Sequence, residues 1–232
     1  MIENHTKCFR VSDTGICSYC YSGNIIKNGT TKTKKQQYFC KNCKKRFLDY
    51  YTYQAYLKNI NSQIVNLTKE GLGIKSTSRI LKISPTTLLK RIITIANNIS
   101  RPQIIYHQEY ELDEMRFFIR KKSNPKWLVY TIDKNTKQVA NFFIGRRNNT
   151  TLSSIVKTLV NARATKIYTD KLINYKYLIP KEIHVTKKYG TNGIERKNLS
   201  IRTNLKRFGR RTICFSKNMV ILISILKIYF WT

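Results

Sequence analysis

Acidic residues are scarce in this sequence. The 232 residues include 12 Asp and Glu against 44 Lys and Arg, which gives a formal net charge of +32. This surplus of positive charge favours a polyanionic partner, because Lys and Arg side chains that contact phosphates release condensed counterions. An A·T-rich coding sequence would also enrich a chain in Lys without any functional cause. Charge alone therefore does not establish nucleic-acid binding.

Long apolar runs are also missing. No stretch approaches the roughly 18 to 20 uninterrupted apolar residues of a membrane-spanning helix. The apolar run 219–226 is followed by Lys227 and is too short to span a bilayer, so we expect a C-terminal helix that packs in a core. The N-terminus shows no secretory signal pattern. We expect a cytoplasmic, nucleoid-associated location and no membrane partner.

Four of the six cysteines follow a metal-binding pattern. Cys17 and Cys20 form one Cys-x2-Cys pair, and Cys40 and Cys43 form a second pair nineteen residues later. This spacing places four thiolates in two knuckles that can close a tetrahedral Zn²⁺ site. The alternative is a disulfide-stapled loop, which the absence of a signal pattern disfavours. Four protein ligands leave no open position for catalysis, so the predicted zinc is structural.

The remainder of the N-terminal region supports a small module around this site. Two short strands with turns are predicted over 23–29 and 36–39, and together with the cysteines they indicate a zinc ribbon. The preceding arm, 1–15, is polar and irregular, and we expect no fold there. His5 and Cys8 of this arm are potential metal ligands, although unpaired arm residues are the simpler interpretation.

A helix-turn-helix pattern follows the cysteines. Apolar residues keep helical spacing over 53–69, and two glycines end that pattern. The segment 74–93 then predicts a short helix, a tight break and a second helix. Ser84 is a suitable N-cap and Pro85 fits the first helical position, so the second helix has a defined start.

The second helix of this pattern is a candidate for contact with double-stranded DNA. Its apolar residues are predicted to face inward: Leu88, Leu89, Ile92 and Ile93. Its polar residues remain available to a major groove: Thr86, Thr87, Lys90 and Arg91. The alternative is an ordinary three-helix packing unit without a DNA-reading role. The polar, proline-broken stretch 97–108 predicts a linker after this helix.

Three acids in the second half of the chain lie at or near the ends of predicted elements. Asp113 lies in the β-prone run 110–118, and Asp170 closes a second short strand, 166–170. Glu195 begins a stretch in which apolar residues recur at helical spacing. Two strand acids and one helix acid can therefore converge on one site.

Convergence of these acids would create a site for hard divalent cations. Carboxylate oxygens suit Mg²⁺ or Mn²⁺, and two such ions roughly 3.5 to 4 Å apart can clamp the attacking and leaving oxygens of a phosphoryl transfer. The period of two places Glu111, Asp113 and Met115 on one strand face. The alternative is that each acid is a solvated charge, and Glu195 in a first helical turn would then be favourable on dipole grounds alone.

The elements around these acids predict an α/β domain. Three strands, 110–118, 126–133 and 138–145, are joined by short turns and indicate an antiparallel meander. The stretch 150–160 reads as a helix that feeds the strand ending at Asp170, which would add in parallel. A mixed sheet with helices of this kind is consistent with an RNase H-like fold.

Several further side chains in this half have two interpretations. The 13 basic residues between 171 and 217 would either cradle phosphates or form a solvated surface. Asp133 is interpreted as a solvated turn charge and is kept as a reserve metal ligand. His184 is a structural histidine or a proton shuttle, and Cys214 is expected to pack in the interior.

Four motifs of the chain resemble the DDE transposases of the insertion-sequence-one family. They are Glu-Leu-Asp-Glu-Met (111–115), Tyr-Thr-Asp (168–170), Ile-Glu-Arg-Lys-Asn-Leu (194–199) and Arg-Arg-Thr-Ile-Cys-Phe-Ser (210–216). The similarity covers residues 16 to about 230. The resemblance implies an RNase H-like catalytic domain in which Asp113, Asp170 and Glu195 form the metal-binding triad. It also places Arg202 at the basic position that follows the glutamate in many DDE enzymes.

The resemblance implies a DNA transposase that uses Mg²⁺ or Mn²⁺ and acts as a homo-oligomer on element ends and target DNA. Two alternatives remain open: a non-catalytic DNA-binding repressor from a decayed element copy, and an RNase H-like nuclease without strand transfer. The expected division of the chain is an arm (1–15), a zinc ribbon (16–50), a helix-turn-helix domain (51–98), a linker (99–109) and an RNase H-like catalytic domain (110–232).

Overall fold

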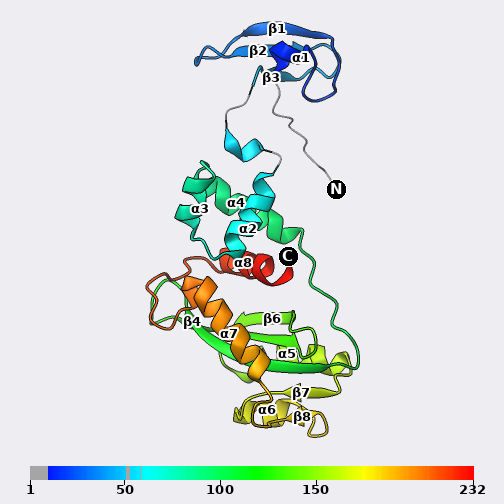
Figure 1. The fold of residues 1–232 in the computed structure, drawn as a ribbon, viewed down its shortest axis with the longest axis vertical. Coiled ribbons are helices and arrows are strands. Elements are labelled where there is room, and N and C mark those ends of the chain that lie inside the picture. The colour runs from blue at the N-terminus through cyan, green and yellow to red at the C-terminus, as the bar shows by residue number, and fades with distance from the viewer. Residues whose placement is uncertain (1–9, 51–52, 58) are drawn as a thin grey trace. The chain divides into compact units, whose positions relative to one another are not determined.

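The computed structural model describes residues 10–50, 53–57 and 59–232 (Figure 1). His5 and Cys8 lie outside the described residues. The chain divides into two compact units. Unit 1 combines residues 1–64 with 74–88, and unit 2 combines residues 65–73 with 89–232.

The N-terminal part of unit 1 is a small sheet with a short helix. The sheet is antiparallel in the order β1-β2-β3, with strands Ile25–Thr30, Gln36–Cys40 and Arg46–Leu48. The third strand was not predicted. The expectation of no fold over 1–15 is wrong for residues 11–14, which form α1 (Val11–Thr14). Val11 is buried beside Phe47, and its backbone N–H donates to the Asp49 carbonyl, so this segment belongs to the small core.

Three helices form the next part of the chain: α2 (Ile60–Lys69), α3 (Ile74–Ile80) and α4 (Pro85–Asn97). The helical spacing that begins at residue 53 overestimated α2, because Leu57 is extended and follows a 3-10 turn, η1 (Gln54–Tyr56). The start of α4 was predicted correctly. Ser84 accepts the backbone N–H of Thr87 at 3.1 Å, which confirms it as the N-cap.

Unit 2 contains a five-stranded mixed sheet in the order β6-β5-β4-β7-β8. The strands are β4 (Glu109–Phe118), β5 (Pro125–Asp133), β6 (Val139–Gly145), β7 (Lys166–Tyr168) and β8 (His184–Val185). Strands β4, β5 and β6 form the predicted antiparallel meander, whereas β7 pairs parallel with β4, and β8 parallel with β7. The mixed α/β class is confirmed.

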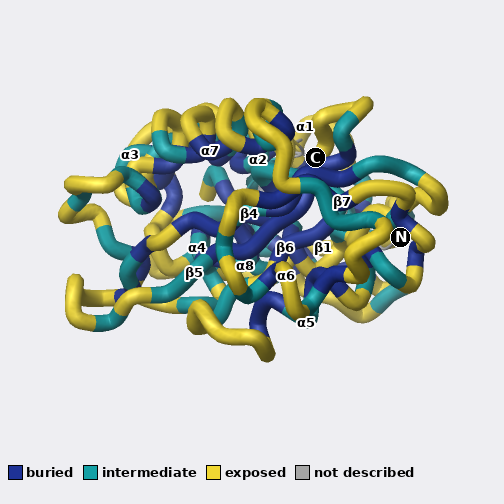
Figure 2. Tube along the Cα trace, turned by 90° about the horizontal axis from the view of Figure 1, so that it is seen from below, coloured by how far each residue is buried: buried dark blue, intermediate teal, exposed yellow. Residues whose placement is uncertain are grey.

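Helices cover both faces of this sheet. On one face, α5 (Asn149–Asn161) and α6 (Ile173–Leu178) bury an apolar core that includes Leu112 and Leu152. On the other face lie α7 (Asn192–Asn204), the 3-10 turn η2 (Lys206–Phe208) and α8 (Met219–Trp231). Figure 2 shows buried positions through β4 and exposed positions along the outer turns of α7.

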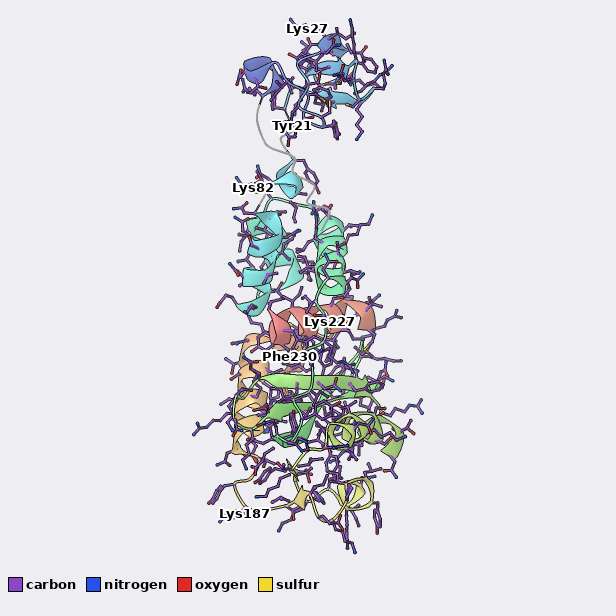
Figure 3. All side chains as sticks on the ribbon, turned by 90° about the vertical axis from the view of Figure 1, so that its right-hand side faces the viewer. Tyr21, Lys27, Lys82, Lys187, Lys227 and Phe230 are labelled. Carbon is purple, nitrogen blue, oxygen red and sulfur yellow. The ribbon has the colours of Figure 1, made fainter. Side chains whose placement is uncertain are left out.

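The C-terminal helix α8 packs in a core, as its apolar run predicted. Phe230 stacks on Tyr130 of the sheet, with ring centroids 5.9 Å apart. Figure 3 labels Phe230 and Lys227 of this helix. Lys227 donates from Nζ to the carbonyls of Ala96 and Ile99 at 3.3 and 3.4 Å. Within the part of the chain that the structure describes, no helix has the length and apolar character needed to cross a membrane.

Candidate active site

Asp113 lies in the middle of β4, on the face that α7 covers. Its Oδ1 accepts a hydrogen bond from the backbone N–H of Glu114 at 2.7 Å. Its Oδ2 accepts a hydrogen bond from Nδ2 of Asn198 in α7 at 2.5 Å. Alternation along the strand places Glu111 and Met115 on this same face, as the period of two predicted. The aspartate is therefore fixed between a strand and a helix.

The environment of Asp113 disfavours its negative charge. Burial raises the pKa of Asp113 to about 6, and the charges of Glu114 and Asp170 act in the same direction. The hydrogen bonds from the Glu114 backbone and from Asn198 oppose this shift. Among the described residues, no cationic side chain forms an ion pair with Asp113. A bound cation would relieve the unfavourable charge.

Asp170 lies beside Asp113 because β7 runs parallel to β4. The register ends with the pair Glu111 and Tyr168, and Asp113 and Asp170 each follow that pair by two residues, which leaves them close enough to interact electrostatically. Neighbouring strands lie about 4.8 Å apart, which explains the electrostatic effect of one acid on the other. Asp170 is exposed and accepts the backbone N–H of Leu172 at 2.9 Å, where the chain turns into α6.

Glu195 lies in the first turn of α7 and is exposed. Its Oε1 accepts the hydroxyl proton of Thr191 at 3.0 Å. Asn198 follows Glu195 by three residues and therefore lies on the same helical face. Because Asn198 contacts Asp113, the helix brings Glu195 to within one turn of that contact.

The three predicted ligands are not gathered around one point. Among the described residues, one group of three or more potential ligands is close enough to hold an ion, and it consists of the four cysteines of the Cys-x2-Cys pairs. The three acids do not form such a group. Asp113 and Asp170 interact electrostatically, but Glu195 is turned toward Thr191. Strand β4 and helix α7, which carry Asp113 and Glu195, therefore contact each other, while the Glu195 carboxylate is hydrogen-bonded to Thr191.

Arg202 lies on the same face of α7 as Glu195 and Asn198. Its Nε is buried and, among the described residues, has no hydrogen-bond partner. Burial lowers the pKa of Arg202, and the charge of Arg210 adds to this effect, whereas Asp113 opposes it. The guanidinium therefore has an unused donor close to the acids.

Glu111 fixes the start of α7 on the sheet, a role that the sequence analysis missed. Its side chain is 1% exposed. One carboxylate oxygen pairs with Nζ of Lys137 at 2.9 Å, and the other accepts the backbone N–H of Ile194 at 2.8 Å. Gly193 allows this approach, because a Cβ there would lie 2.6 Å from the Glu111 carboxylate.

Glu114 points to the opposite face and is also paired. Its Oε1 contacts Nη2 of Arg147 at 2.7 Å, and its Oε2 accepts the hydroxyl proton of Tyr175 in α6 at 2.7 Å. Glu111 and Glu114 thus each form an ion pair, whereas Asp113 between them forms none with the described residues.

Comparisons with known proteins decide the family. The family model described as IS1 transposase matches residues 108–230. The chain belongs to the IS1 transposase family. The earlier resemblance is confirmed, and the proposed acids of this IS1 family member all lie within the matched range.

Curated proteins similar to part of this chain include two InsB proteins. The insertion element iso-IS1n protein InsB of Shigella dysenteriae is 35% identical over 111 residues, which are 48% of this chain and 85% of the relative. The insertion element IS1 2 protein InsB of Escherichia coli strain K12 is 33% identical over 109 residues, which are 47% of this chain and 65% of the relative.

Two solved structures are also similar. The simian T-cell lymphotropic virus intasome in complex with PP2A regulatory subunit B56 gamma has a TM-score of 0.39 at 14% identity, over 70% of this chain and 66% of that chain. The HTLV-2 integrase catalytic core domain in complex with magnesium (trimeric form) has a TM-score of 0.35 at 15% identity, over 55% of this chain and 86% of that chain.

In this IS1 family member, Asn198 and Tyr130 contact the candidate site, although neither was selected from the sequence. The Tyr130 hydroxyl donates to Oδ1 of Asn198 at 2.9 Å, and Asn198 donates to Asp113. The helical spacing of Asn198 after Glu195 was the available signal. Nothing in the sequence links Tyr130 to this helix before the sheet is known.

Asp133 and His184 of this IS1 family member both form hydrogen bonds within the fold. Asp133 is not the solvated charge that we expected. It is 5% exposed because its Oδ1 accepts the backbone N–H groups of Asn135 and Thr136, both at 2.8 Å. Nε2 of His184 lies 2.7 Å from the Thr169 hydroxyl, and burial lowers the pKa of this histidine.

Cysteines of the N-terminal sheet region form a compact cluster of sulfur atoms: Cys17, Cys20, Cys40 and Cys43. All four lie within 4.8 Å of one another; Cys17 and Cys43 are 3.7 Å apart, and Cys20 and Cys40 are 3.5 Å apart. Zn–S bonds of about 2.3 Å in a tetrahedron require similar separations. The backbone N–H of Cys43 lowers the pKa of Cys40 to about 7. Cys214, expected in the interior, is exposed instead.

The candidate DNA-contacting residues on α4 differ in exposure. Thr86 and Lys90 are exposed, whereas Thr87 and Arg91 are half-buried. The Thr87 hydroxyl lies 2.7 Å from the hydroxyl of Tyr53, so part of its hydrogen-bonding capacity is used within unit 1.

Proposed function

We propose that this IS1 family member is a DNA transposase that cleaves and joins DNA strands by metal-dependent phosphoryl transfer. The observation that supports this proposal is the position of Asp113. Among the described residues it is the acid of β4 that forms no ion pair. It also interacts electrostatically with Asp170 and is hydrogen-bonded to the helix that carries Glu195.

The proposed metal ligands are Asp113, Asp170 and Glu195. Their donor atoms are all carboxylate oxygens, which suit Mg²⁺ or Mn²⁺. The raised pKa of Asp113 and the repulsion from Asp170 fit a site that takes up positive charge. Glu195 would exchange its bond to Thr191 for the ion. Bound divalent ions would activate the attacking oxygen and stabilise the leaving oxygen.

The proposed reaction has two transfers of the same kind. First, a water oxygen bonds to phosphorus at the element end, the P–O3′ bond breaks, and a free 3′-OH is released. That 3′ oxygen then bonds to a target phosphorus and displaces a target 3′ oxygen. No covalent bond to the protein forms. Arg202 would donate from its buried, unpartnered Nε to a phosphate oxygen or orient Glu195.

The remaining modules would bring DNA to this site. A structural Zn²⁺ on Cys17, Cys20, Cys40 and Cys43 would hold the ribbon (16–50) together. A helix-turn-helix domain (51–98) would present Thr86, Thr87, Lys90 and Arg91 to the element ends. The linker (99–109) would lead to an RNase H-like catalytic domain (110–232), and protomers would assemble on double-stranded DNA in the cytoplasm.

The test is an assay of cleavage and strand transfer on labelled DNA that carries the element's own ends, with Mg²⁺ or Mn²⁺. Wild type is compared with Asp113→Asn, Asp170→Asn and Glu195→Gln. Glu182→Gln is the matched control, because Glu182 is an exposed acid of the same unit. We expect metal-dependent joined products from wild type and from the control. Each triad variant should bind the ends and give no product.

The other outcomes identify the alternatives. Binding to the ends without cleavage by wild type would indicate a DNA-binding repressor. Cleavage without joined products would indicate a nuclease. Full activity of any triad variant would remove that residue from the proposed site.

A further inference from the structure

We propose that Asn198 is a positioning residue that fixes the Asp113 carboxylate for metal binding and is itself oriented by Tyr130. This inference rests on the proposed function, because it assigns a role toward the same carboxylate site. Asn198 acts through Asp113 and does not touch the reacting atoms in this proposal.

The chemistry of Asp113 determines which way the Asn198 amide points. An ionised carboxylate only accepts hydrogen bonds, so the NH₂ group of Asn198 must face it. The amide oxygen of Asn198 therefore faces Tyr130, whose hydroxyl must donate, and the separation is 2.9 Å. Asn198 is 7% exposed, so water does not compete freely for these contacts.

Tyr130 is held firmly enough to orient the amide. It is 0% exposed, and its ring stacks on Phe230. Its hydroxyl also lies 3.2 Å from the carbonyl of Ile194 in α7. Burial raises the pKa of Tyr130, so the hydroxyl keeps its proton and remains a donor. The tyrosine thus has one fixed donor directed at α7.

The two hydrogen bonds of Asp113 leave room for metal. A carboxylate offers about four acceptor positions. In the structure, one is used by the Glu114 backbone and one by Asn198, each on a different oxygen. The plane of the carboxylate is thereby fixed, while each oxygen keeps an acceptor position for an ion.

The Asn198 bond also links Asp113 to Glu195. Asn198 is three residues after Glu195 on one face of α7, so the bond sets the distance between the two acids. Helix α7 has separate attachments to the sheet: Ile194 and Ile201 are both 0% exposed, and Glu111 holds its first turn. Contacts other than those of Asn198 therefore also hold α7 on the sheet, so the effect of its polar bond can be tested.

The experiment measures Mn²⁺ binding from the fall in the electron paramagnetic resonance signal of free Mn²⁺. The full chain is loaded with zinc beforehand, since thiolates prefer zinc and carboxylates take Mn²⁺. We expect Asn198→Ala to weaken Mn²⁺ binding at the Asp113 site about 10-fold or more, the effect typical of removing a partner of a metal ligand. Tyr130→Phe keeps the ring packing and should weaken binding in the same direction, by less.

Ile201→Val is the matched control for looser packing of α7. It should lower the thermal midpoint and leave Mn²⁺ affinity unchanged. If Asn198 has only a structural role, Asn198→Ala and Tyr130→Phe will behave like this control, and the inference is overturned. If Asn198→Ala does not fold, Tyr130→Phe alone decides between these results.

Asp113→Asn separates this inference from the proposed function. Loss of Mn²⁺ binding in Asp113→Asn, with normal binding in Asn198→Ala and Tyr130→Phe, overturns only the role of Asn198. Unchanged Mn²⁺ binding in Asp113→Asn overturns the metal site and the inference together. Recovery of Asn198→Ala cleavage at high Mn²⁺ concentration would add support, because a structural defect would not respond to metal.

Discussion

The cysteine site and the carboxylate site of this protein are built in different ways. The four thiols lie within 4.8 Å of one another and come from two local knuckles. The three carboxylates come from β4, from the loop after β7 and from α7, and one of them is turned away. The cysteines, which local spacing places in two knuckles, are gathered, whereas the carboxylates, whose positions depend on long-range packing, are not.

Charge explains part of this difference. Thiols can lose protons when a metal binds, so four of them can approach one another without it. Carboxylates at neutral pH repel one another. Burial is the main cause of the raised pKa of Asp113, and the charges of Glu114 and Asp170 add to it. In the proposed site, a bound cation would compensate this charge and allow the three carboxylates to converge.

The largest expected effect is at the cysteine site. Cys40→Ser, or removal of zinc by a chelator, should unfold the ribbon, because its small core cannot hold without the metal. The measurement is zinc content together with proteolysis of residues 10–50. Cys214→Ser, at an exposed cysteine, is the control and should retain one zinc per chain. If residues 10–50 stay folded without zinc, the strands alone stabilise this region. The proposed contrast between the cysteines and the carboxylates would then be weakened.

A smaller loss of stability is expected from Glu114→Gln. This change removes the charge that pairs with Arg147 and leaves the Tyr175 hydroxyl with a poorer partner in a buried position. We expect a loss of about 2 kcal/mol in the free energy of unfolding. Urea unfolding measures it, with the exposed Glu182→Gln as control. Wild-type stability in Glu114→Gln would mean that the paired acids of β4 are not structural.

Asp113→Asn should increase the free energy of unfolding, whereas Glu114→Gln should reduce it. The size of this increase should depend on pH. The folded-state pKa of Asp113 is about 6, above its usual value. Protonated Asp113 therefore contributes to the stability of the folded state at pH below about 4, and this contribution is lost as pH rises through about 6. Without added divalent metal, the stability of Asp113→Asn relative to wild type should increase between pH 4 and pH 7. Allowing for solvent screening, we expect about 1 to 2 kcal/mol.

The pH dependence of the difference isolates the charge. Hydrogen bonds lost in Asp113→Asn change stability equally at all pH values, so only the slope reports the ionisation. Mn²⁺ should flatten the slope by stabilising wild type. If the stability difference between Asp113→Asn and wild type does not change with pH without metal, the surroundings of Asp113 do not disfavour its charge. That result would weaken the contrast with the cysteine site.

The same contrast explains what the sequence could predict. Cysteine spacing, the Ser84 cap and the three-strand meander depend on near neighbours, and the structure contains the cluster, the cap and the meander. The contacts of Tyr130 and Glu111 with α7 join residues 64 and 83 positions apart or more. No local pattern contains them, because the pairing appears only when the helix crosses the sheet.

Surface exposure was misjudged for a related reason. From its place in the sequence, Asp133 was expected to be a solvated charge in a turn. The turn instead folds over the carboxylate, which accepts two of its backbone N–H groups. Cys214 reads as an interior residue by its type, but its segment follows the end of η2 and leaves the thiol exposed. In both cases the burial depends on backbone geometry that residue type does not specify.

The smallest expected effect tests a contact that is wholly local. Ser84→Ala removes the oxygen that accepts the Thr87 backbone N–H at the start of α4, and should cost about 1 kcal/mol in stability. Thr86→Ala is the control, because Thr86 is exposed two residues away in the same turn and should change stability by less. Urea unfolding measures both. Since α4 also has a buried apolar face, including Leu88, the helix should persist in Ser84→Ala. A loss much larger than that of one cap would mean that this break holds α3 and α4 together, and that even a contact within four residues depends on the tertiary fold.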